Sequence, residues 1–441
     1  MLPELDVGDW LYYEDMGAYT LSMATIFNGL DATAIKYHCL EELCGDETST
    51  IVILIEMNVL LTFLSKRAFT EQILKQYFGK LDTVNTMKKR LTDRCVVDLH
   101  PERRSTHEII QNVVSEKQRK GDDDRFVVCD VGDIIQKFQH WVTLMPRIKL
   151  FYAVKCNTDE ALLQVLSDMG ASFDCASKKE IEAVLNLGVS PTRIVYAHPC
   201  KPVSSLNFAK SRDVSLMTFD NVNELQKVKE TYPSARLLLR LLPEKEFNAR
   251  LEFSGRYGCS STEVRYILQT AKDLELNIFG VSFHVGSDIQ DPRAYVSILQ
   301  QSRSVFDIAR RMGFNMNILD IGGGFPGEQN TFERFKEITE VINKTLLDLF
   351  LPEDNVEIIA EPGRYIAASA FTVVASIMSK RCYQSSADGD VNGQDSAQLK
   401  RNVATYFLND SVFGNFMYGR LYMPGSVIHI PKVVKVRVLF S

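Results

Sequence analysis

A lysine stands at the end of an apolar run in the first half of the chain. The stretch Phe151-Tyr-Ala-Val-Lys-Cys-Asn157 carries strand-forming residues into a turn that contains Lys155. Burying an ammonium group without a partner is costly, so a strand that finishes in lysine is unusual for a plain core element. A lysine in this position can form a Schiff base with a carbonyl compound. A surface lysine at a strand end would explain the same stretch, so Lys155 alone predicts no site.

Other side chains with chemical capacity stand at the ends of later apolar runs. For any one of them an ordinary structural role is the simpler interpretation, because a single histidine on an apolar strand is usually a core residue and three successive glycines often make a tight turn. In a barrel of alternating strands and helices, however, the carboxyl ends of the strands meet at one mouth. The set that would line this mouth consists of Lys155, Asp174, Arg240, His284, Ser287, Gly322, Gly323, Gly324, Glu361 and Arg364.

A regular alternation of apolar strands and amphipathic helices positions this set. Eight strand-helix units predict an α/β fold, a closed (β/α)8 barrel. The predicted strands are Lys149–Val154, Ser172–Cys175, Ile194–Ala197, Ser215–Phe219, Leu237–Leu241, Phe279–Val285, Ile318–Ile321 and Glu357–Ala360. The predicted helices include Asp159–Met169, Lys178–Leu187, Thr262–Leu274, Tyr295–Met312 and Phe332–Phe350.

The flanking segments predict a second, β-rich domain. Between its parts we expect a helical linker over about residues 44–100, a helix around Ile134–Trp141 and a polar loop at Tyr383–Ala397. The predicted strands of this domain are residues 7–13, 17–20 and 27–29, Phe126–Val131, Phe371–Met378, Val403–Leu408 and Val427–Phe440.

The types of residue around the barrel mouth favour one cofactor. The glycines after the seventh strand and Arg364 after the eighth stand where such barrels commonly hold a phosphate group. A lysine that can attach an aldehyde, a phosphate anchor and a carboxylate that can pair with a pyridinium nitrogen are what pyridoxal 5'-phosphate requires of its protein. Glu361 would keep the ring nitrogen protonated, and His284 could stack on the ring.

Composition excludes several other classes. The 441 residues carry a net charge of −6, with 45% hydrophobic and 24% charged residues, which is typical of a soluble globular protein without a basic patch for nucleic acid. The nine cysteines lack the spacing of a disulfide scaffold or a zinc site, so we expect no metal and a reducing compartment. The start lacks the features of a signal peptide, and the apolar run from Ile51 to Leu64 is too short to span a bilayer. We therefore expect a cytoplasmic protein whose partners are small molecules or other proteins.

Five ordered motifs resemble the eukaryotic ornithine decarboxylase family, within the group IV pyridoxal-phosphate-dependent decarboxylases. The resemblance runs from about Thr106 to Phe416, and it implies an alanine-racemase-like barrel with a β-domain. The motifs are Phe151-Tyr-Ala-Val-Lys-Cys-Asn157, Phe173-Asp-Cys-Ala-Ser-Lys178, Phe283-His-Val-Gly-Ser287, Asp320-Ile-Gly-Gly-Gly-Phe-Pro-Gly327 and Glu361-Pro-Gly-Arg-Tyr365.

The resemblance implies an activity and a role for each residue of the set. The activity is the decarboxylation of a basic amino acid, L-ornithine to putrescine and carbon dioxide, by a homodimer. Lys155 would attach the cofactor, Glu361 would pair with its ring nitrogen and His284 would stack on its ring. The phosphate would contact Ser287, the three glycines, Arg364 and Tyr19. Asp174 and Arg240 match further positions around the cofactor.

The order of the chain departs from the family. Residues 1–40 resemble the family's extreme C-terminal portion, in which Phe27 and Asn28 would lie near the active site. A circular permutation would explain this order. We favour a join between the tail of one gene copy and the body of its neighbour. The expected segments are 1–40, displaced β-domain; 41–105, linker; 106–145, strand and lead-in helix; 146–366, barrel; and 367–441, truncated β-domain.

The substrate-binding part of the family pattern is incomplete. The family has a Tyr-Asp pair whose acid binds the substrate's terminal amine, whereas this chain reads Tyr418-Gly419. We also find no counterpart of the family's Cys-Asp loop, so we expect impaired turnover. An alternative is a non-catalytic regulator that binds antizyme through the surface from His198 to Asp220. Retention of Lys155 and Asp174 argues against the catalytically dead inhibitor branch of the family.

Overall fold

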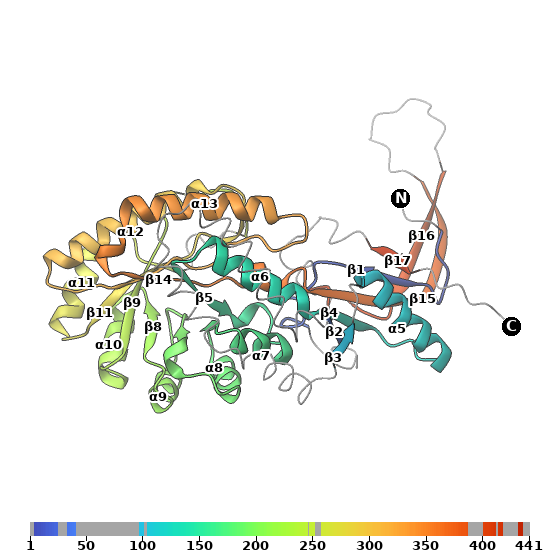
Figure 1. The fold of residues 1–441 in the computed structure, drawn as a ribbon, viewed down its shortest axis with the longest axis horizontal. Coiled ribbons are helices and arrows are strands. Elements are labelled where there is room, and N and C mark those ends of the chain that lie inside the picture. The colour runs from blue at the N-terminus through green and yellow to red at the C-terminus, as the bar shows by residue number, and fades with distance from the viewer. Residues whose placement is uncertain are drawn as a thin grey trace, which may run out of the picture.

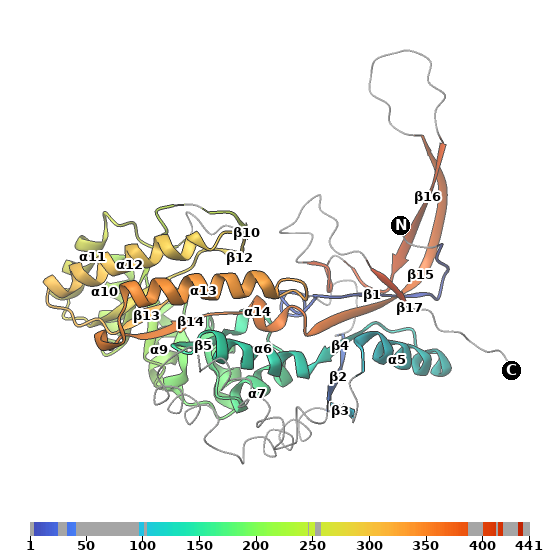
Figure 2. The same ribbon diagram turned by 45° about the horizontal axis from the view of Figure 1, so that its top comes forward.

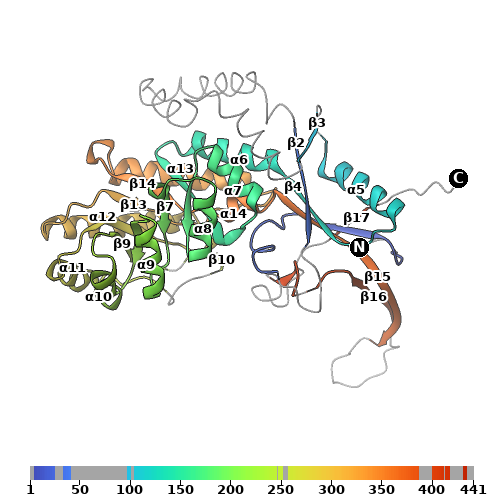
Figure 3. The ribbon, with the colours of Figure 1, turned by 90° about the horizontal axis from the view of Figure 1, so that it is seen from below.

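The structure is a computed structural model that describes residues 4–24, 33–40, 97–100, 104–245, 247–251, 257–386, 400–411, 413–417 and 431–434. It consists of a helix-wrapped barrel and a β-rich sheet that lie side by side along the long axis of the molecule (Figure 1, Figure 3). The predicted combination of an α/β barrel and a β-domain is confirmed as the fold.

Eight parallel strands close the barrel, as the alternating pattern predicts. Each observed strand lies within two residues of its predicted bounds. The last residue of each strand therefore reaches the same mouth of the barrel. Around the barrel the strands follow the order β11 (Ile278–Phe283), β13 (Ile318–Asp320), β14 (Glu357–Ala360), β5 (Ile148–Ala153), β6 (Ser172–Cys175), β7 (Ile194–Tyr196), β8 (Leu216–Phe219) and β9 (Arg236–Leu241).

Helices cover the outside of the barrel (Figure 1). Two of them, α9 and α10, fill gaps of the predicted alternation for which no helix bounds were given. Apolar side chains including Phe151, Val195 and Leu238 fill the interior of the barrel. The covering helices are α7 (Glu160–Asp168), α8 (Lys178–Asn186), α9 (Val203–Ser211), α10 (Val222–Thr231), α11 (Val264–Asp273), α12 (Arg293–Arg311) and α13 (Phe332–Leu349), and the short α14 (Arg364–Ala367) follows β14.

The second body is a seven-stranded sheet. Helix α5 (Thr106–Lys120) packs on it and α6 (Val131–Leu144) leads from it into the barrel. The ribbon formed by β15 and β16 extends away from the rest of the molecule (Figure 2). The strand order is β17 (Lys432–Val434), β1 (Trp10–Tyr13), β15 (Phe371–Ser386), β4 (Phe126–Asp130), β2 (Ala34–Leu40) and β3 (Val97–His100), with β16 (Lys400–Leu408) paired to β15.

The N-terminal residues are part of this sheet. Trp10 to Tyr13 pair antiparallel with β15, and Ala34 to His38 pair in parallel with Phe126 to Asp130 of β4. Segments at the two ends of the sequence therefore share one hydrogen-bonded layer with the lead-in strand.

Several predictions for the β-domain were wrong. Residues 17–20 form turns rather than a strand, because Gly17 and Tyr19 bond individually to the barrel rather than to a strand edge. Residues 97–100 are strand β3, not part of a helix. Strand β15 continues to Ser386 and so includes the first four residues of the predicted loop that begins at Tyr383. Val131 begins a helix, since Asp130 caps it through Asp133 N. Most of the predicted linker lies outside the described residues.

Candidate active site

Lys155 lies in a 3-10 turn directly after β5. Strand β6 pairs with β5 in a register that sets Ala153 beside Asp174, and Lys155 Nζ forms an ion pair with Asp174 Oδ2. The Lys155 side chain is 37% exposed, whereas that of Asp174 is fully buried. Burial alone would lower the pKa of Lys155, but the charges of Asp174 and Glu361 raise it above its ordinary value. Lys155 is thus a cation held at the barrel mouth by a buried carboxylate.

Glu361 follows β14 and lies in an acidic environment. Burial, with the charges of Asp174 and Asp320, raises the pKa of Glu361 well above its ordinary value. Burial also raises the pKa of Asp320 to about 6, and the two carboxyl groups share a hydrogen bond. One oxygen on each of Glu361 and Asp174 is buried without a hydrogen-bond partner among the described residues. The environment of Glu361 therefore favours its protonated form, and its Oε1 atom is the oxygen without a partner among the described residues.

His284 follows β11 and is neutral. Its Nδ1 accepts a hydrogen bond from the backbone N–H of Gly286 at 3.1 Å, so the proton of the neutral ring sits on Nε2. Burial, followed by the charges of Arg240 and Lys155, lowers the pKa of His284 well below its ordinary value. A neutral ring next to two cations can present a flat face to an aromatic ligand.

Other parts of the chain pack closely against the three glycines after β13. Gly322 and Gly324 have φ angles of +61° and +117°, which side-chain-bearing residues rarely adopt. A Cβ atom on Gly322 would lie 2.1 Å from the carbonyl oxygen of Phe283, and one on Gly323 would lie 3.0 Å from Nε2 of His284. Side chains are therefore excluded from this loop, which fits the predicted cradle for an anionic group.

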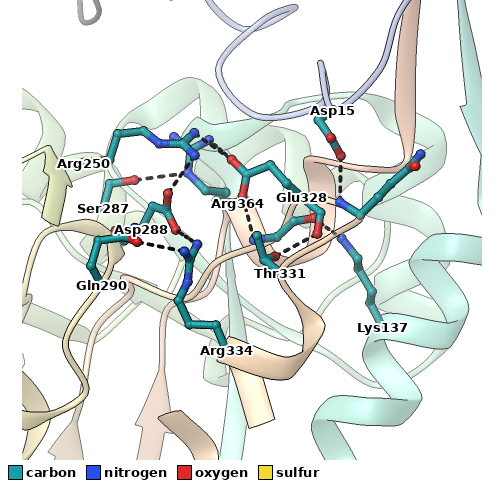
Figure 4. A network of polar contacts seen from close by, with 12 residues as sticks. Asp15, Lys137, Arg250, Ser287, Asp288, Gln290, Glu328, Thr331, Arg334 and Arg364 are labelled. Atoms are coloured by element: carbon teal, nitrogen blue, oxygen red, sulfur yellow. Dashed lines mark hydrogen bonds and ion pairs between the residues drawn. The ribbon is translucent and has the colours of Figure 1, made fainter. Parts of the chain in front are cut away.

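Arg364 and Ser287 lie next to one another on the same side of the mouth (Figure 4). Nε of Arg364 donates to Oγ of Ser287 at 3.3 Å, and both side chains are buried. The Tyr19 ring lies 5.7 Å from the Arg364 guanidinium. Three residues predicted to contact a phosphate thus come together from two distant parts of the sequence.

Arg240, at the end of β9, lies toward another part of the mouth. Its guanidinium is 5.5 Å from the ring of Tyr257, and its charge contributes to the lowered pKa of His284.

The N-terminal segment is joined to the lysine turn. The backbone N–H of Tyr19 donates to the carbonyl oxygen of Cys156 at 2.8 Å, and the side-chain amide of Asn157 donates to the carbonyl oxygen of Gly17 at 3.0 Å. Tyr19 has a φ of +59°, a conformation that these bonds hold in place. The predicted positions of Phe27 and Asn28 lie outside the described residues, as do residues 418–424.

Sequence reasoning missed four residues behind Arg364. They form a network of ion pairs with it (Figure 4). For two of them the available signal was a position next to a predicted site residue or motif, since Asp288 follows Ser287 and Glu328 follows the glycine motif. The four are Arg250, Asp288, Glu328 and Arg334.

Two features are absent from the described residues. No helix among them is long and apolar enough to cross a bilayer. No group of three or more histidine, cysteine or acidic side chains there could hold a metal ion.

The arrangement fits a ligand with an anionic group at one end and a cationic nitrogen at the other. The glycine loop, Ser287 and Arg364 can bind a phosphate through N–H and guanidinium donors. The free oxygen of Glu361 can bind a protonated ring nitrogen, and Lys155 supplies the amine for attachment. The residues present therefore fit pyridoxal phosphate.

Comparisons with known proteins agree with this geometry. Residues 131–368 match the family model described as "Pyridoxal-dependent decarboxylase, pyridoxal binding domain". Antizyme inhibitor 2 of Xenopus laevis is 42% identical over 311 residues, and ornithine decarboxylase of Rattus norvegicus is 42% identical over 309 residues. Each match covers 70% of this chain, and this chain spans 66% of the length of each relative.

A solved decarboxylase structure is also similar to this chain. The arginine decarboxylase of Paramecium bursaria Chlorella virus superposes with a TM-score of 0.64 and 34% identity, covering 71% of this chain and 79% of that chain. The chain therefore belongs to the pyridoxal-dependent decarboxylase family that includes ornithine decarboxylase.

Proposed function

We propose that this protein is a pyridoxal-phosphate-dependent lyase that decarboxylates a basic amino acid, with L-ornithine giving putrescine and carbon dioxide. One observation carries the proposal: the Lys155–Asp174 ion pair, the free oxygen of Glu361 and the phosphate cradle lie at one barrel mouth. By resemblance to the family, we also propose a cytoplasmic homodimer.

The residues of the mouth have separate tasks in this proposal. When bound, pyridoxal phosphate supplies an aldehyde and a conjugated ring that withdraws electrons from the bond that breaks. Lys155 provides the amine, and Asp174 orients it. Glu361 can hand its proton to the ring nitrogen and remain beside it as the carboxylate. His284 packs against the ring, while Ser287, Arg364, Tyr19 and the glycine loop hold the phosphate.

We propose that turnover is reduced relative to a complete family member. The family resemblance implies an acidic residue that binds the distal amine of the substrate at the position where this chain has Gly419. One charge-assisted hydrogen bond is worth about 1.5–3 kcal/mol. Losing it would weaken the discrimination between ornithine and amino acids without a distal amine, and leave cofactor attachment unaffected.

The test separates cofactor attachment from chemistry. The purified protein is titrated with pyridoxal phosphate while the visible absorbance of lysine-attached cofactor is recorded, and release of carbon dioxide from ornithine, lysine and arginine is assayed. We expect pyridoxal phosphate to attach, and carbon dioxide to be released slowly from at least one of the three amino acids. Attachment without release from any of them would refute decarboxylation and leave the cofactor assignment intact. The Lys155→Ala variant is the background control.

A second candidate is a regulator that binds antizyme, as the name antizyme inhibitor 2 states for the Xenopus laevis relative. By resemblance, the docking surface would run from His198 to Asp220. Helix α9 lies in this stretch and begins at Val203, whose side chain is 52% exposed. Binding of purified antizyme should be weakened by Val203→Glu but not by Val7→Glu, a control that alters another exposed valine in the β-domain. Equal binding by all forms would contradict this candidate.

A further inference from the structure

Glu328 joins two of the arginines near the phosphate cradle (Figure 4). Its Oε1 atom lies 2.7 Å from Nη1 of Arg250 and 3.3 Å from Nη1 of Arg364. The Glu328 side chain is 11% exposed and that of Arg364 is 5% exposed. The carboxylate therefore contacts Arg364 on the edge away from the bond between Arg364 Nε and Ser287.

The charge of Glu328 is permanent at working pH. Burial alone would raise its pKa, but Arg364 and Arg250, with backbone N–H groups including that of Gly327, hold the pKa at about 2. A guanidinium does not lose its proton in this range either. The geometry of the Arg364–Glu328 contact is therefore independent of pH.

Asp288 completes the arrangement. Its two oxygens accept ion pairs from Arg250 at 2.7 Å and Arg334 at 2.6 Å, and its side chain is buried. Asp288 has a φ of +56°, and it directly follows Ser287. Asp288 therefore binds Arg250 and Arg334, whereas Glu328 contacts Arg250 and Arg364.

We infer that Glu328 is a positioning residue for cofactor binding: it fixes the plane of the Arg364 guanidinium, so that the remaining N–H groups face a phosphate at the glycine loop. This inference rests on the proposed function. Glu328 does not face the cofactor directly in this account, and it acts through Arg364. A planar, fixed guanidinium loses little side-chain freedom when it binds a phosphate.

A role of Glu328 in charge neutralisation alone predicts the opposite change in phosphate affinity. If Glu328 served only to neutralise its neighbours, removing its charge would leave three guanidiniums with one carboxylate and would strengthen the binding of a phosphate. Positioning instead requires that removal weakens binding. The sign of the change in affinity therefore separates the two roles.

The experiment compares pyridoxal phosphate with pyridoxal, which has the same aldehyde and ring but no phosphate. Both are titrated against wild type, Glu328→Gln and Glu328→Asp, with Lys155→Ala as background for attachment to other lysines. The Glu328→Asp variant keeps the negative charge but moves it away from Arg364, because the aspartate side chain is one methylene group shorter. We expect both variants to bind pyridoxal phosphate about tenfold more weakly, the loss of roughly one charge-assisted hydrogen bond. Pyridoxal affinity should stay the same.

A matched control uses Glu333→Gln. Glu333 lies in the first turn of α13, is 84% exposed and pairs with Lys336. This change removes the same charge without touching the network, so both affinities should equal those of wild type.

Three outcomes would overturn the inference: tighter or unchanged binding of pyridoxal phosphate by Glu328→Gln, unchanged binding by Glu328→Asp, or an equal loss for both ligands, which would indicate a general structural role. Wild-type protein that attaches neither ligand would overturn the proposed function as well. If Glu328→Gln does not fold, Glu328→Asp alone decides, because a counter-charge role predicts no loss for it.

Discussion

The two ends of the barrel mouth have opposite charge. At the lysine end a single ammonium faces a cluster of buried carboxyl groups. At the arginine end three guanidiniums face two carboxylates. The lysine end contains Lys155, Asp174, Asp320 and Glu361, and the arginine end contains Arg250, Arg334, Arg364, Asp288 and Glu328.

The two ends also relieve their excess charge differently. Carboxyl groups can take up protons, and burial with mutual repulsion raises the pKa values of Glu361 and Asp320. Guanidiniums cannot give up protons, so the arginine end stays positive. The lysine end can therefore adapt to a cationic ring nitrogen, whereas the arginine end is permanently suited to a phosphate.

Removing the Lys155 ammonium from the lysine end should cause the largest change in free energy among the predictions made for the two ends. Lys155→Met leaves Asp174 buried and unpaired, and we expect the free energy of unfolding of the cofactor-free protein to fall by about 2–4 kcal/mol. Urea denaturation followed by circular dichroism measures it. Adding Asp174→Asn should restore most of the loss, because no buried charge is then left unpaired. A Lys155→Met variant as stable as wild type would show that this ion pair is not a structural element of the mouth.

Removing one guanidinium from the arginine end should mainly affect phosphate binding. We expect Arg364→Met to weaken the binding of pyridoxal phosphate about 100-fold, the loss of two charge-assisted hydrogen bonds, and to leave pyridoxal binding unchanged. Fluorescence titration measures both affinities.

The matched control for this change is Arg334→Met. Arg334 pairs with Asp288 and Gln290 rather than with Ser287, so its loss should reduce the affinity far less. Similar losses in the two variants would contradict the assignment of Arg364 as the phosphate ligand.

A smaller effect, on the pH dependence of stability, is expected at Asp15, which borders the arginine end (Figure 4). Its Oδ1 accepts from the backbone N–H of Gln329 at 2.9 Å. Burial, and further the charge of Glu328, raises the pKa of Asp15 to about 6, while Lys137 opposes the shift. The native state therefore holds this proton more tightly than the unfolded chain, so the contribution of Asp15 to stability falls as pH rises from about 4 to 6.

Asp15→Asn should remove this cost. Above pH 6 we expect the variant to be more stable than wild type by on the order of 1–2 kcal/mol, with no difference below about pH 4. Thermal denaturation across this pH range measures it. Glu333→Gln is the control, since Glu333 pairs with Lys336 and is not among the groups that shift the pKa of Asp15, and it should give no such gain. A stability difference that does not depend on pH would refute the titration of Asp15.

The barrel could be predicted from the sequence because its strands are short, apolar and end in polar or glycine residues. This pattern also placed Lys155, Asp174 and Glu361 at one mouth. The ion-pair network could not be predicted. Arg250, Asp288 and Arg334 lie on different elements far apart in the sequence, and no helical or strand periodicity relates their positions. Strand β3 was missed because residues 97–100 stand at the end of a segment whose amphipathic pattern favoured a helix. Tyr19 could not be placed by pattern because its position depends on bonds to the barrel.

The order of the chain stays a prediction. Strands β1 and β2 share the sheet with β15 and β4, an arrangement that a permuted chain would adopt. We continue to favour a join of two gene copies, which predicts that peptides spanning Leu40 to Arg94 are absent from the natural protein. Mass spectrometry of that protein would find them if the order is genuine.

The most direct test of the account is the site of cofactor attachment. The protein is incubated with pyridoxal phosphate, reduced with borohydride and digested, and the modified peptides are mapped by mass spectrometry. We expect stoichiometric pyridoxyl modification of the peptide that contains Lys155. In the Lys155→Ala variant the corresponding peptide, which contains Asn157, should be unmodified. Modification at other lysines with Lys155 unmodified would contradict the account.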